Sequence, residues 1–304
     1  AFSNSYYGNN WRTEMLNIAS AYVKQPEVAK YIKEFKIFNA GNNVAQEIAQ
    51  VRQMILAGYD AIVIDGASPT GLDSVINEAV RQHVLVVAFD NTVGTDKAVN
   101  NNESQYDMGR QWAEFLAKET GGKGTILMVR GLAGTTVDND QAEGAHDVFK
   151  KYPDIKTVEV YGNWDVGTNQ KVAADALATH HDIAAVWGTE GMTGTLQAFL
   201  QQKAKLVPMT SESDNGFMML AVEHKVPTLV IGQSPALVAA GIRAAIALLD
   251  GQEIPRTANI PLNPIKTAEM QAGRDYFPKL PNSFVTNVSI PQCGIQIPAE
   301  QAIK

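Results

Sequence analysis

The chain repeats one pattern, a short apolar run followed by a helical segment, from its start almost to its end. The runs are apolar along their whole length, which is typical of parallel strands covered on both faces. This alternation predicts an α/β fold with parallel sheets flanked by helices. The predicted strands are Phe35–Ala40, Ala61–Ile64, Leu85–Phe89, Thr125–Val129, Val158–Tyr161, Ala184–Trp187, Leu206–Thr210 and Thr228–Gly232, and Ala1-Phe2-Ser3 reads as the end of an earlier one.

Amphipathic segments with caps at their ends lie between these runs. After Gly251 prolines become frequent, so we expect an extended tail wrapping one lobe, with a helix only over Ala268–Tyr276. Because no Met and no charged leader precede the first strand, we expect a processed or trimmed chain that lacks part of this strand. The main predicted helices are Val44–Leu56, Asp107–Lys118, Gln141–Lys151, Gly167–Thr179 and Pro235–Leu249.

The pattern also divides into two similar halves. Residues 1–102 and 124–233 each hold about four strand–helix units, which predicts two Rossmann-like lobes. Asp65 and Asp90 follow consecutive strands of the first half, and Glu190 and Glu212 follow consecutive strands of the second. A single acid there can simply cap a helix, but four in matching places favour a shared site. We expect it in a cleft between the lobes, at the carboxyl ends of the strands.

Composition excludes several classes of protein. With 32 acidic and 25 basic residues the net charge is −7, so a nucleic-acid partner is not expected. No run approaches the ~18 apolar residues of a membrane span, so membrane insertion is not expected either. The five histidines have no partners at metal-ligand spacing, and the Gly-rich turn at 131–136 lacks phosphate-loop spacing and its lysine. We therefore expect no metal and no cofactor.

Aromatic and amide side chains accompany the acids. Asn10, Trp11 and Arg12 follow the first strand, and Trp164 follows the matching strand of the second half. A flat indole suits the C–H face of a sugar ring, and guanidinium and carboxylate groups suit its hydroxyl rim. Polar neighbours lead us to expect both tryptophans to be exposed in loops, although core packing is the ordinary place for a tryptophan. We expect no catalysis: Cys293 has no nearby base in the sequence and no nucleophile elbow is present.

Together these stretches resemble a known family, the type I periplasmic sugar-binding proteins of bacterial ABC importers, in the ribose- and galactofuranose-binding group. The similarity runs in order from about residue 10 to about residue 250. The stretches that carry it are Asn10-Trp11-Arg12, Phe89-Asp90-Asn91, Gly131-Leu132-Ala133-Gly134-Thr135 and Ile231-Gly232-Gln233-Ser234-Pro235.

The resemblance implies two lobes, residues 1–103 plus 234–262 and residues 104–233 plus 263–304. They would be joined by three crossings, near Asn102–Ser104, Gln233–Pro235 and Leu262–Pro264, and would close by hinge motion around one sugar. The ligand contacts that it implies are Asn10, Trp11, Arg12, Asp65, Asp90, Asn91, Gln141, Trp164, Glu190, Glu212 and Gln233.

Departures from the family pattern bear on the ligand. Ribose binders have Arg where Asn91 and Gln141 stand, Asn where Glu190 stands and Asp where Glu212 stands, which argues against ribose itself. Arg12 is the single cation among these residues, and buried carboxylates need compensation. A neutral monosaccharide, a sugar alcohol or a cationic amino sugar therefore stay open as ligands.

The resemblance also implies a partner and a location. We expect a monomeric receptor that serves an ABC permease, either exported to the periplasm with its signal peptide removed or lipid-anchored outside a Gram-positive cell. Two alternatives stay open: the sugar-sensing core of a lactose-repressor-type regulator, which shares the fold, and an enzyme on an α/β scaffold.

Overall fold

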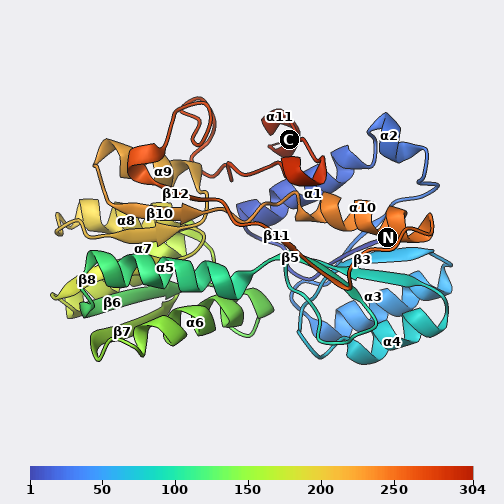
Figure 1. Cartoon of the computed structure of the whole chain (residues 1–304), viewed down its shortest axis with the longest axis horizontal. Helices are drawn as coiled ribbons and strands as arrows, with labels where there is room; N and C mark the ends of the chain where they lie inside the picture. The colour runs from blue at the N-terminus through green and yellow to red at the C-terminus, as the bar shows by residue number, and fades with distance from the viewer. Residues whose placement is uncertain (304) are drawn as a thin grey trace. The chain divides into compact units, whose positions relative to one another are not determined.

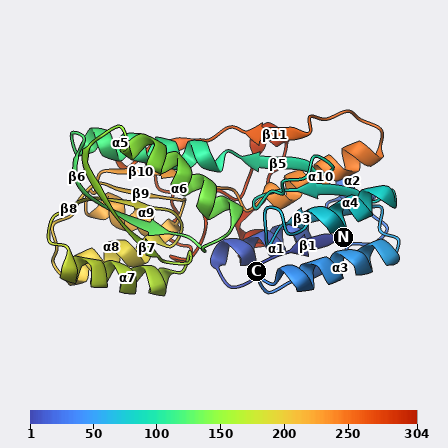
Figure 2. The same ribbon diagram turned by 90° about the horizontal axis from the view of Figure 1, so that it is seen from below.

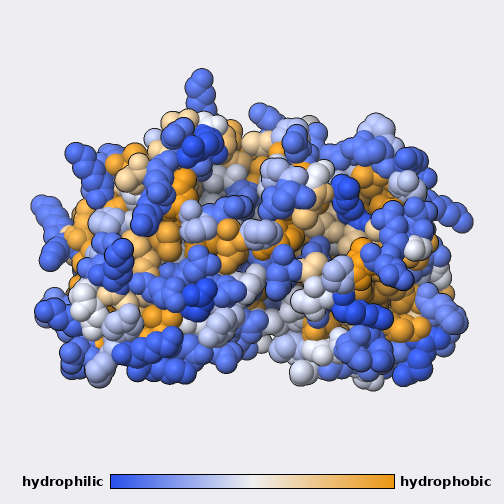
Figure 3. Space-filling model, viewed as in Figure 1, coloured by the Kyte–Doolittle hydropathy of each residue, from blue (hydrophilic) through white to orange (hydrophobic). Residues whose placement is uncertain are grey.

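The computed structural model describes residues 1–303 and divides the chain into two compact units. Unit 1 comprises Ala1–Glu103, Ser234–Ile260 and the chain from Val288 onward, and unit 2 comprises Ser104–Gln233 and Pro261–Asn287. Each unit has its own six-stranded sheet. On the face drawn in Figure 3, hydrophilic residues cover most of the surface and hydrophobic residues form separate patches.

Unit 1 is a parallel sheet between two layers of helices, with the strand order β11-β5-β4-β3-β1-β2. Helices α1 and α10 lie on one face of the sheet, and α3 and α4 lie on the other (Figure 1). The strands are β1 (Phe2–Asn4), β2 (Ile37–Asn39), β3 (Ala61–Asp65), β4 (Leu85–Ala88), β5 (Val99–Glu103) and β11 (Thr257–Ile260). The helices are α1 (Asn10–Tyr22), α2 (Pro26–Ala29), α3 (Val44–Leu56), α4 (Asp73–Arg81), α10 (Leu237–Leu249) and α11 (Ala299–Ala302).

Unit 2 repeats this plan with the strand order β12-β10-β9-β8-β6-β7, in which only β12 runs antiparallel to its neighbour. Helices α5 and α6 cover one face, and α7 and α8 cover the other (Figure 2). The strands are β6 (Lys123–Arg130), β7 (Asp154–Tyr161), β8 (Ile183–Gly188), β9 (Met209–Ser211), β10 (Thr228–Ile231) and β12 (Pro264–Lys266). The helices are α5 (Gln105–Glu119), α6 (Thr136–Phe149), α7 (Val166–Thr179), α8 (Met192–Gln201) and α9 (Asn215–Glu223).

Strand β6 shows why such runs are apolar throughout. Ile126 and Met128 join the core beneath α5 and α6, whereas Leu127 and Val129 join the core on the opposite face. Successive side chains of a strand point to opposite faces, so a sheet covered twice needs apolar residues at every position. The predicted α/β class with parallel sheets flanked by helices is confirmed.

Both sheets share one topology. In each sheet the first strand of the unit lies between the second and the third: β1 lies between β2 and β3, and β6 lies between β7 and β8. The chain connections on the two sides of this first strand therefore run in opposite directions. Loops at this switch point separate at the carboxyl ends of the strands and leave a crevice, which is the usual place for ligands in such sheets. The relevant strand pairs are β1 with β3, and β6 with β8.

The tail differs from its prediction in two ways. Ala268–Tyr276 is not a helix: a 3-10 turn, η1 (Thr267–Glu269), is followed by irregular chain. The Asp275 carboxylate accepts a hydrogen bond from Gln271 N at 2.8 Å, and Gly273 adopts φ +81°, so local side-chain bonding and a left-handed residue replace the helical pattern.

The tail also does not stay with one unit. Residues 288–303 lie with unit 1, so the expected assignment of the whole tail from 263 to the second lobe is wrong. Buried Ile290 and Ile295 anchor this segment, and Asn17 of α1 donates a hydrogen bond to Ala302 O at 2.8 Å. The chain therefore passes between the units four times, at 103/104, 233/234, 260/261 and 287/288, where three crossings were expected. Among residues 1–303, no helix combines the length and the apolar character needed to cross a membrane.

Candidate functional site

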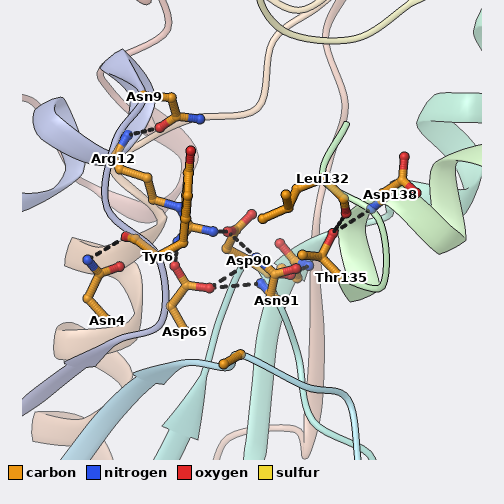
Figure 4. Close-up of polar contacts among 12 residues, drawn as sticks. Asn4, Tyr6, Asn9, Arg12, Asp65, Asp90, Asn91, Leu132, Thr135 and Asp138 are labelled. Atoms are coloured by element: carbon orange, nitrogen blue, oxygen red, sulfur yellow. Dashed lines mark hydrogen bonds and ion pairs between the residues drawn. The ribbon is translucent and has the colours of Figure 1, made fainter. Parts of the chain in front are cut away.

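A buried charge cluster lies at the carboxyl edge of the first sheet. Arg12, in the first turn of α1, pairs through Nη1 with Asp65 at the end of β3 and through Nη2 with Asp90 at 2.7 Å (Figure 4). Asn91 Nδ2 donates to Asp65 Oδ1 at 3.1 Å and to Asp90 Oδ2 at 2.9 Å. All four residues are 3% exposed or less. Two carboxylates thus share one guanidinium, and the cluster keeps a formal charge of −1.

The start of α1 places Arg12 in this cluster. Asn9 caps the helix, since its Oδ1 accepts a hydrogen bond from Arg12 N at 2.8 Å. Trp11 lies beside the guanidinium, with Arg12 Cζ 5.1 Å from the ring centroid. Trp11 is only 2% exposed, so its expected exposure in a loop is wrong, whereas Asn10 is exposed. The polar neighbour Asn9 marks a helix cap and not an exposed loop.

Asp90 is held in an uncommon backbone conformation. Its φ is +56°, a left-handed value that only a few per cent of non-glycine residues adopt. Its carbonyl oxygen accepts hydrogen bonds from Asn102 Nδ2 at 2.7 Å and from Thr92 N at 3.1 Å. Such backbone strain persists only where surrounding contacts fix it, and it concentrates at functional sites.

Glu47 acts electrostatically on Arg12 of this cluster and was not predicted from the sequence. Its carboxylate accepts hydrogen bonds from Ser3 Oγ at 2.9 Å and from Ala67 N at 2.7 Å, which ties α3 to β1 and to the chain after β3. Burial raises its pKa to about 7, against the lowering effect of these hydrogen bonds and of Arg12. A glutamate in the first turn of a helix gives no sequence signal that distinguishes it from a surface residue.

Unit 2 brings three polar side chains together at the matching edge of its sheet. Gln141 Nε2 donates to Gln105 Oε1 at 2.8 Å and to Glu212 Oε1 at 3.4 Å. Helix α6 begins at Thr136, earlier than expected, because Thr135 Oγ1 caps it by accepting from Asp138 N at 3.3 Å. Gln141 is therefore inside the helix and fully buried. Gln105, at the start of α5, was not predicted.

Trp164 is positioned by a tight turn and a glycine. Asn163 and Trp164 both have left-handed φ values, +57° and +59°, and Asp165 N donates to Gly162 O at 3.1 Å across the turn. The indole lies against Gly131, where any side chain would overlap it. Trp164 is 6% exposed, so the prediction of a loop-exposed ring is wrong here as well.

Asp138 holds the turn that carries Gly131. Its Oδ1 accepts from Gly131 N at 2.9 Å, and its Oδ2 pairs with Arg130 Nη2 at 2.7 Å. Thr135 Oγ1 also donates to Leu132 O at 2.8 Å (Figure 4). The Gly-rich turn is thus closed by its own side chains into a fixed support for Trp164.

Glu190 and Gln233 lie where their strands end, 7% and 3% exposed respectively. The Glu190 peptide is fixed, since its carbonyl accepts from Asn169 Nδ2 at 2.9 Å. The following helix, α8, is capped from a distance by Asp214, which accepts hydrogen bonds from the backbone N–H groups of Gly191, Met192 and Thr193. Burial raises the pKa of Asp214 to about 7 despite these bonds.

Other chemistry has little support in the described part of the chain. Within residues 1–303, no cluster of three or more His, Cys, Asp and Glu side chains could hold a metal ion. The Cys293 thiol is half-buried, and burial raises its pKa, which disfavours the reactive thiolate. What the two edges offer is a set of rigidly held hydrogen-bonding groups and aromatic faces.

Comparison with known proteins places the chain in a family. The family model described as periplasmic binding protein domain matches residues 1–253. The ribose import binding protein of Haemophilus influenzae is 23% identical over 75% of this chain and 78% of its own length. The xylitol-binding protein of Mycolicibacterium smegmatis is 25% identical over 71% of this chain and 64% of its own.

A solved structure agrees with this placement. The ABC transporter solute-binding protein of Thermobispora bispora superimposes with a TM-score of 0.80 at 29% identity, covering 86% of this chain and 83% of its own. The expected two-unit α/β fold, the order of the motifs and the family model agree. The chain therefore belongs to the periplasmic binding protein domain family, with the type I fold that the sequence predicted.

Proposed function

We propose that this chain is a solute receptor that captures a monosaccharide or a related polyol and delivers it to an ABC permease without changing it chemically. The relatives are named for ribose and xylitol, and a structure with a TM-score of 0.79 is that of an arabinose receptor from Shewanella bound to L-arabinofuranose. A monomer exported to the periplasm is the form that fits such a receptor. No observation favours the transcription regulator or the enzyme.

The observation that carries this proposal is the cluster of Arg12, Asp65, Asp90 and Asn91. Sugar hydroxyls both donate and accept hydrogen bonds, and a carboxylate paired with a guanidinium is a group that accepts hydrogen bonds from hydroxyls strongly. Because the chain already fixes these groups, a sugar that binds them gains hydrogen bonds without the entropic cost of ordering the side chains.

The proposed contacts come from both carboxyl edges. Arg12 and the two aspartates bind hydroxyl groups, and the faces of Trp11 and Trp164 cover apolar C–H groups of the ring. The remaining proposed contacts are Asn10, Asn91, Gln141, Glu190, Glu212 and Gln233.

The structure bears on the charge of the ligand. Asp65 and Asp90 share the one guanidinium of Arg12 within their own unit, so one of their two negative charges is compensated without any ligand. We therefore propose a neutral sugar or sugar alcohol first, and the remaining negative charge keeps an amino sugar as the alternative ligand.

A thermal-shift screen tests the proposal. Pentoses, hexoses, furanose-forming sugars, amino sugars and polyols are each added to the protein, and a matching ligand at about 100 times its Kd adds about 2.7 kcal/mol to the free energy of unfolding. Trp164→Ala should reduce the shift to about half or less, whereas Tyr152→Ala, which changes an exposed aromatic residue of unit 2, should keep it. If no compound shifts the wild-type protein, the proposed function is wrong.

A further inference from the structure

Two polar side chains at the end of β5 tie this strand to other segments of unit 1. Asn102 Nδ2 donates to Asp90 O at 2.7 Å, and Asn102 Oδ1 accepts from Glu103 N at 2.9 Å. Glu103 Oε2 in turn accepts from Ser234 N at 3.1 Å. We call Asn102 and Glu103 together the β5 clasp.

The β5 clasp joins two of the places where the chain passes between the units. Glu103 is the last residue of unit 1 before the chain first leaves it, and Ser234 is the first residue after the chain returns. Ser234 also organises the approach to α10, because its Oγ accepts from Ala236 N at 3.2 Å and its carbonyl accepts from Leu237 N at 3.0 Å. Loss of the Glu103–Ser234 hydrogen bond is therefore expected to disturb the backbone at the start of α10.

The other end of the clasp holds the peptide of a proposed ligand contact. Asp90 has a left-handed backbone, and Asn102 bonds its carbonyl while Arg12 pairs with its carboxylate. Without the Asn102 hydrogen bond, the left-handed backbone of Asp90 loses a contact that offsets its strain. The Asp90 carboxylate is then no longer held in one orientation.

We infer that Asn102 and Glu103 are positioning residues for sugar binding: they fix the Asp90 peptide relative to two chain crossings, so that the crossings and this carboxylate move together. This inference rests on the proposed function. It assigns a role in binding to two residues that do not touch the sugar themselves and act through Asp90 and Ser234.

Glu103 makes the clasp sensitive to pH. It is 4% exposed, and burial together with the neighbouring charge of Asp90 raises its pKa to about 8, against the lowering effect of the Ser234 hydrogen bond. Glu103 also acts on the thiol of Cys293, at the end of η2 (Pro291–Cys293), and this thiol is influenced in turn by Arg243 of α10. At neutral pH the carboxyl is mostly protonated. Above pH 8 a negative charge appears beside Asp90 and repels its carboxylate, although the ionised group accepts the Ser234 hydrogen bond more strongly.

Strand β5 supplies its own control. Asn100, two residues before Asn102, clamps the same loop through Val93 instead of Asp90: its Nδ2 donates to Val93 O at 3.1 Å and its Oδ1 accepts from Val93 N at 3.3 Å. Asn102→Ala and Asn100→Ala thus remove comparable amide side chains from one strand, but only the first releases the Asp90 peptide.

Hydrogen exchange without any sugar tests the clasp directly. Asn102→Ala should speed exchange in peptides that cover 89–92 by about fivefold or more, whereas Asn100→Ala should leave Asp90 unaffected and act around Val93. Equal exchange around Asp90 in the two variants would overturn the inference. This experiment needs no ligand, so its failure can be distinguished from a failure of the proposed sugar-binding function.

A pH profile of affinity supplies the second arm, with the sugar that gives the largest shift in the screen as the probe. The Kd of the wild-type protein should rise about fivefold or more from pH 7 to pH 9. In Glu103→Gln, which keeps an oxygen for Ser234 and has no charge, the Kd should rise by clearly less, since only other groups such as Glu47 still ionise there. Glu119→Gln, at the exposed end of α5, should keep the wild-type profile. A Glu103→Gln profile that follows the wild type would contradict the role of Glu103. If Glu103→Gln does not fold, the exchange comparison of the two asparagine variants still decides whether the β5 clasp positions the Asp90 peptide.

Discussion

Replacing Arg12 with methionine should destabilise unit 1 strongly, because it leaves two buried carboxylates without their cation. Asp65 is fully buried and Asp90 is 3% exposed, and both pair with Arg12. Removing one partner of a buried ion pair costs about 3–5 kcal/mol, since the remaining charge stays desolvated. For a unit of this size each kcal/mol of lost unfolding free energy lowers the melting temperature by about 2–4 °C, so we expect the melting temperature of Arg12→Met to fall by about 10 °C.

The effect should depend on pH. A protonated carboxyl group can be buried without a counter-charge, so the loss in Arg12→Met should be largest at pH 8 and smaller at pH 4.5. Arg12→Met/Asp65→Asn removes one of the two stranded charges and should recover part of the loss at pH 8. Urea unfolding followed by circular dichroism at both pH values measures all three proteins.

Arg110→Met is the matched control. Arg110 also pairs with two acids, Asp107 at 3.0 Å and Glu114 at 2.8 Å, but its side chain is 35% exposed. Exposed pairs are worth about 0–1 kcal/mol, so this variant should unfold nearly as the wild type does. The reasoning is refuted if Arg12→Met loses less than about 1 kcal/mol at pH 8, or no more than Arg110→Met.

Two further predictions concern pH and packing. The free energy of unfolding should fall as pH rises from about 5 to 9, measured by urea titration, because burial raises the pKa of Glu47 to about 7, of Asp214 to about 7 and of Glu103 to about 8. These groups hold protons in the folded state that the unfolded chain has already released, so a stability that rises over this range would contradict the burial argument. Gly131→Ala should weaken sugar binding about tenfold or more in calorimetry, because the added methyl overlaps the Trp164 indole. Gly167→Ala, whose added methyl comes no nearer than 3.4 Å to Asp165, should bind normally, and equal affinities for the two variants would remove Trp164 from the site.

The fold could be predicted largely because buried parallel strands need apolar residues on both faces. Strand β5 escaped prediction, since Val99 is its only apolar residue and asparagines follow it. Asn100 and Asn102 use their amides to clamp the loop before the strand, through Val93 and Asp90 respectively. A pattern of hydrophobicity has no means of detecting a strand of that kind.

The site could be predicted where a residue's position follows from the end of a strand. Asp65 and Asp90 lie together at one edge for that reason, and Glu212 lies beside Gln141. Gln105 could not be found in this way, because its place depends on how α5 packs against α6.

Both tryptophans were wrongly expected to be exposed, because their polar neighbours looked like loop residues. Asn9 and Asp165 instead cap α1 and α7, where they accept hydrogen bonds from Arg12 N at 2.8 Å and Thr168 N at 2.7 Å. A cap residue has the same composition as an exposed loop residue, although Trp11 is buried just after one cap and Trp164 is buried directly before the other.

The most direct test of the account is isothermal titration calorimetry of the wild-type protein with the sugar that the thermal screen selects, followed by mass spectrometry of the recovered ligand. We expect saturable binding of one sugar per chain, at least tenfold weaker in Trp164→Ala, and recovery of the sugar with its mass unchanged. Absence of binding heat across the panel, or recovery of a converted product, would contradict the central claim that this chain captures a sugar and releases it intact.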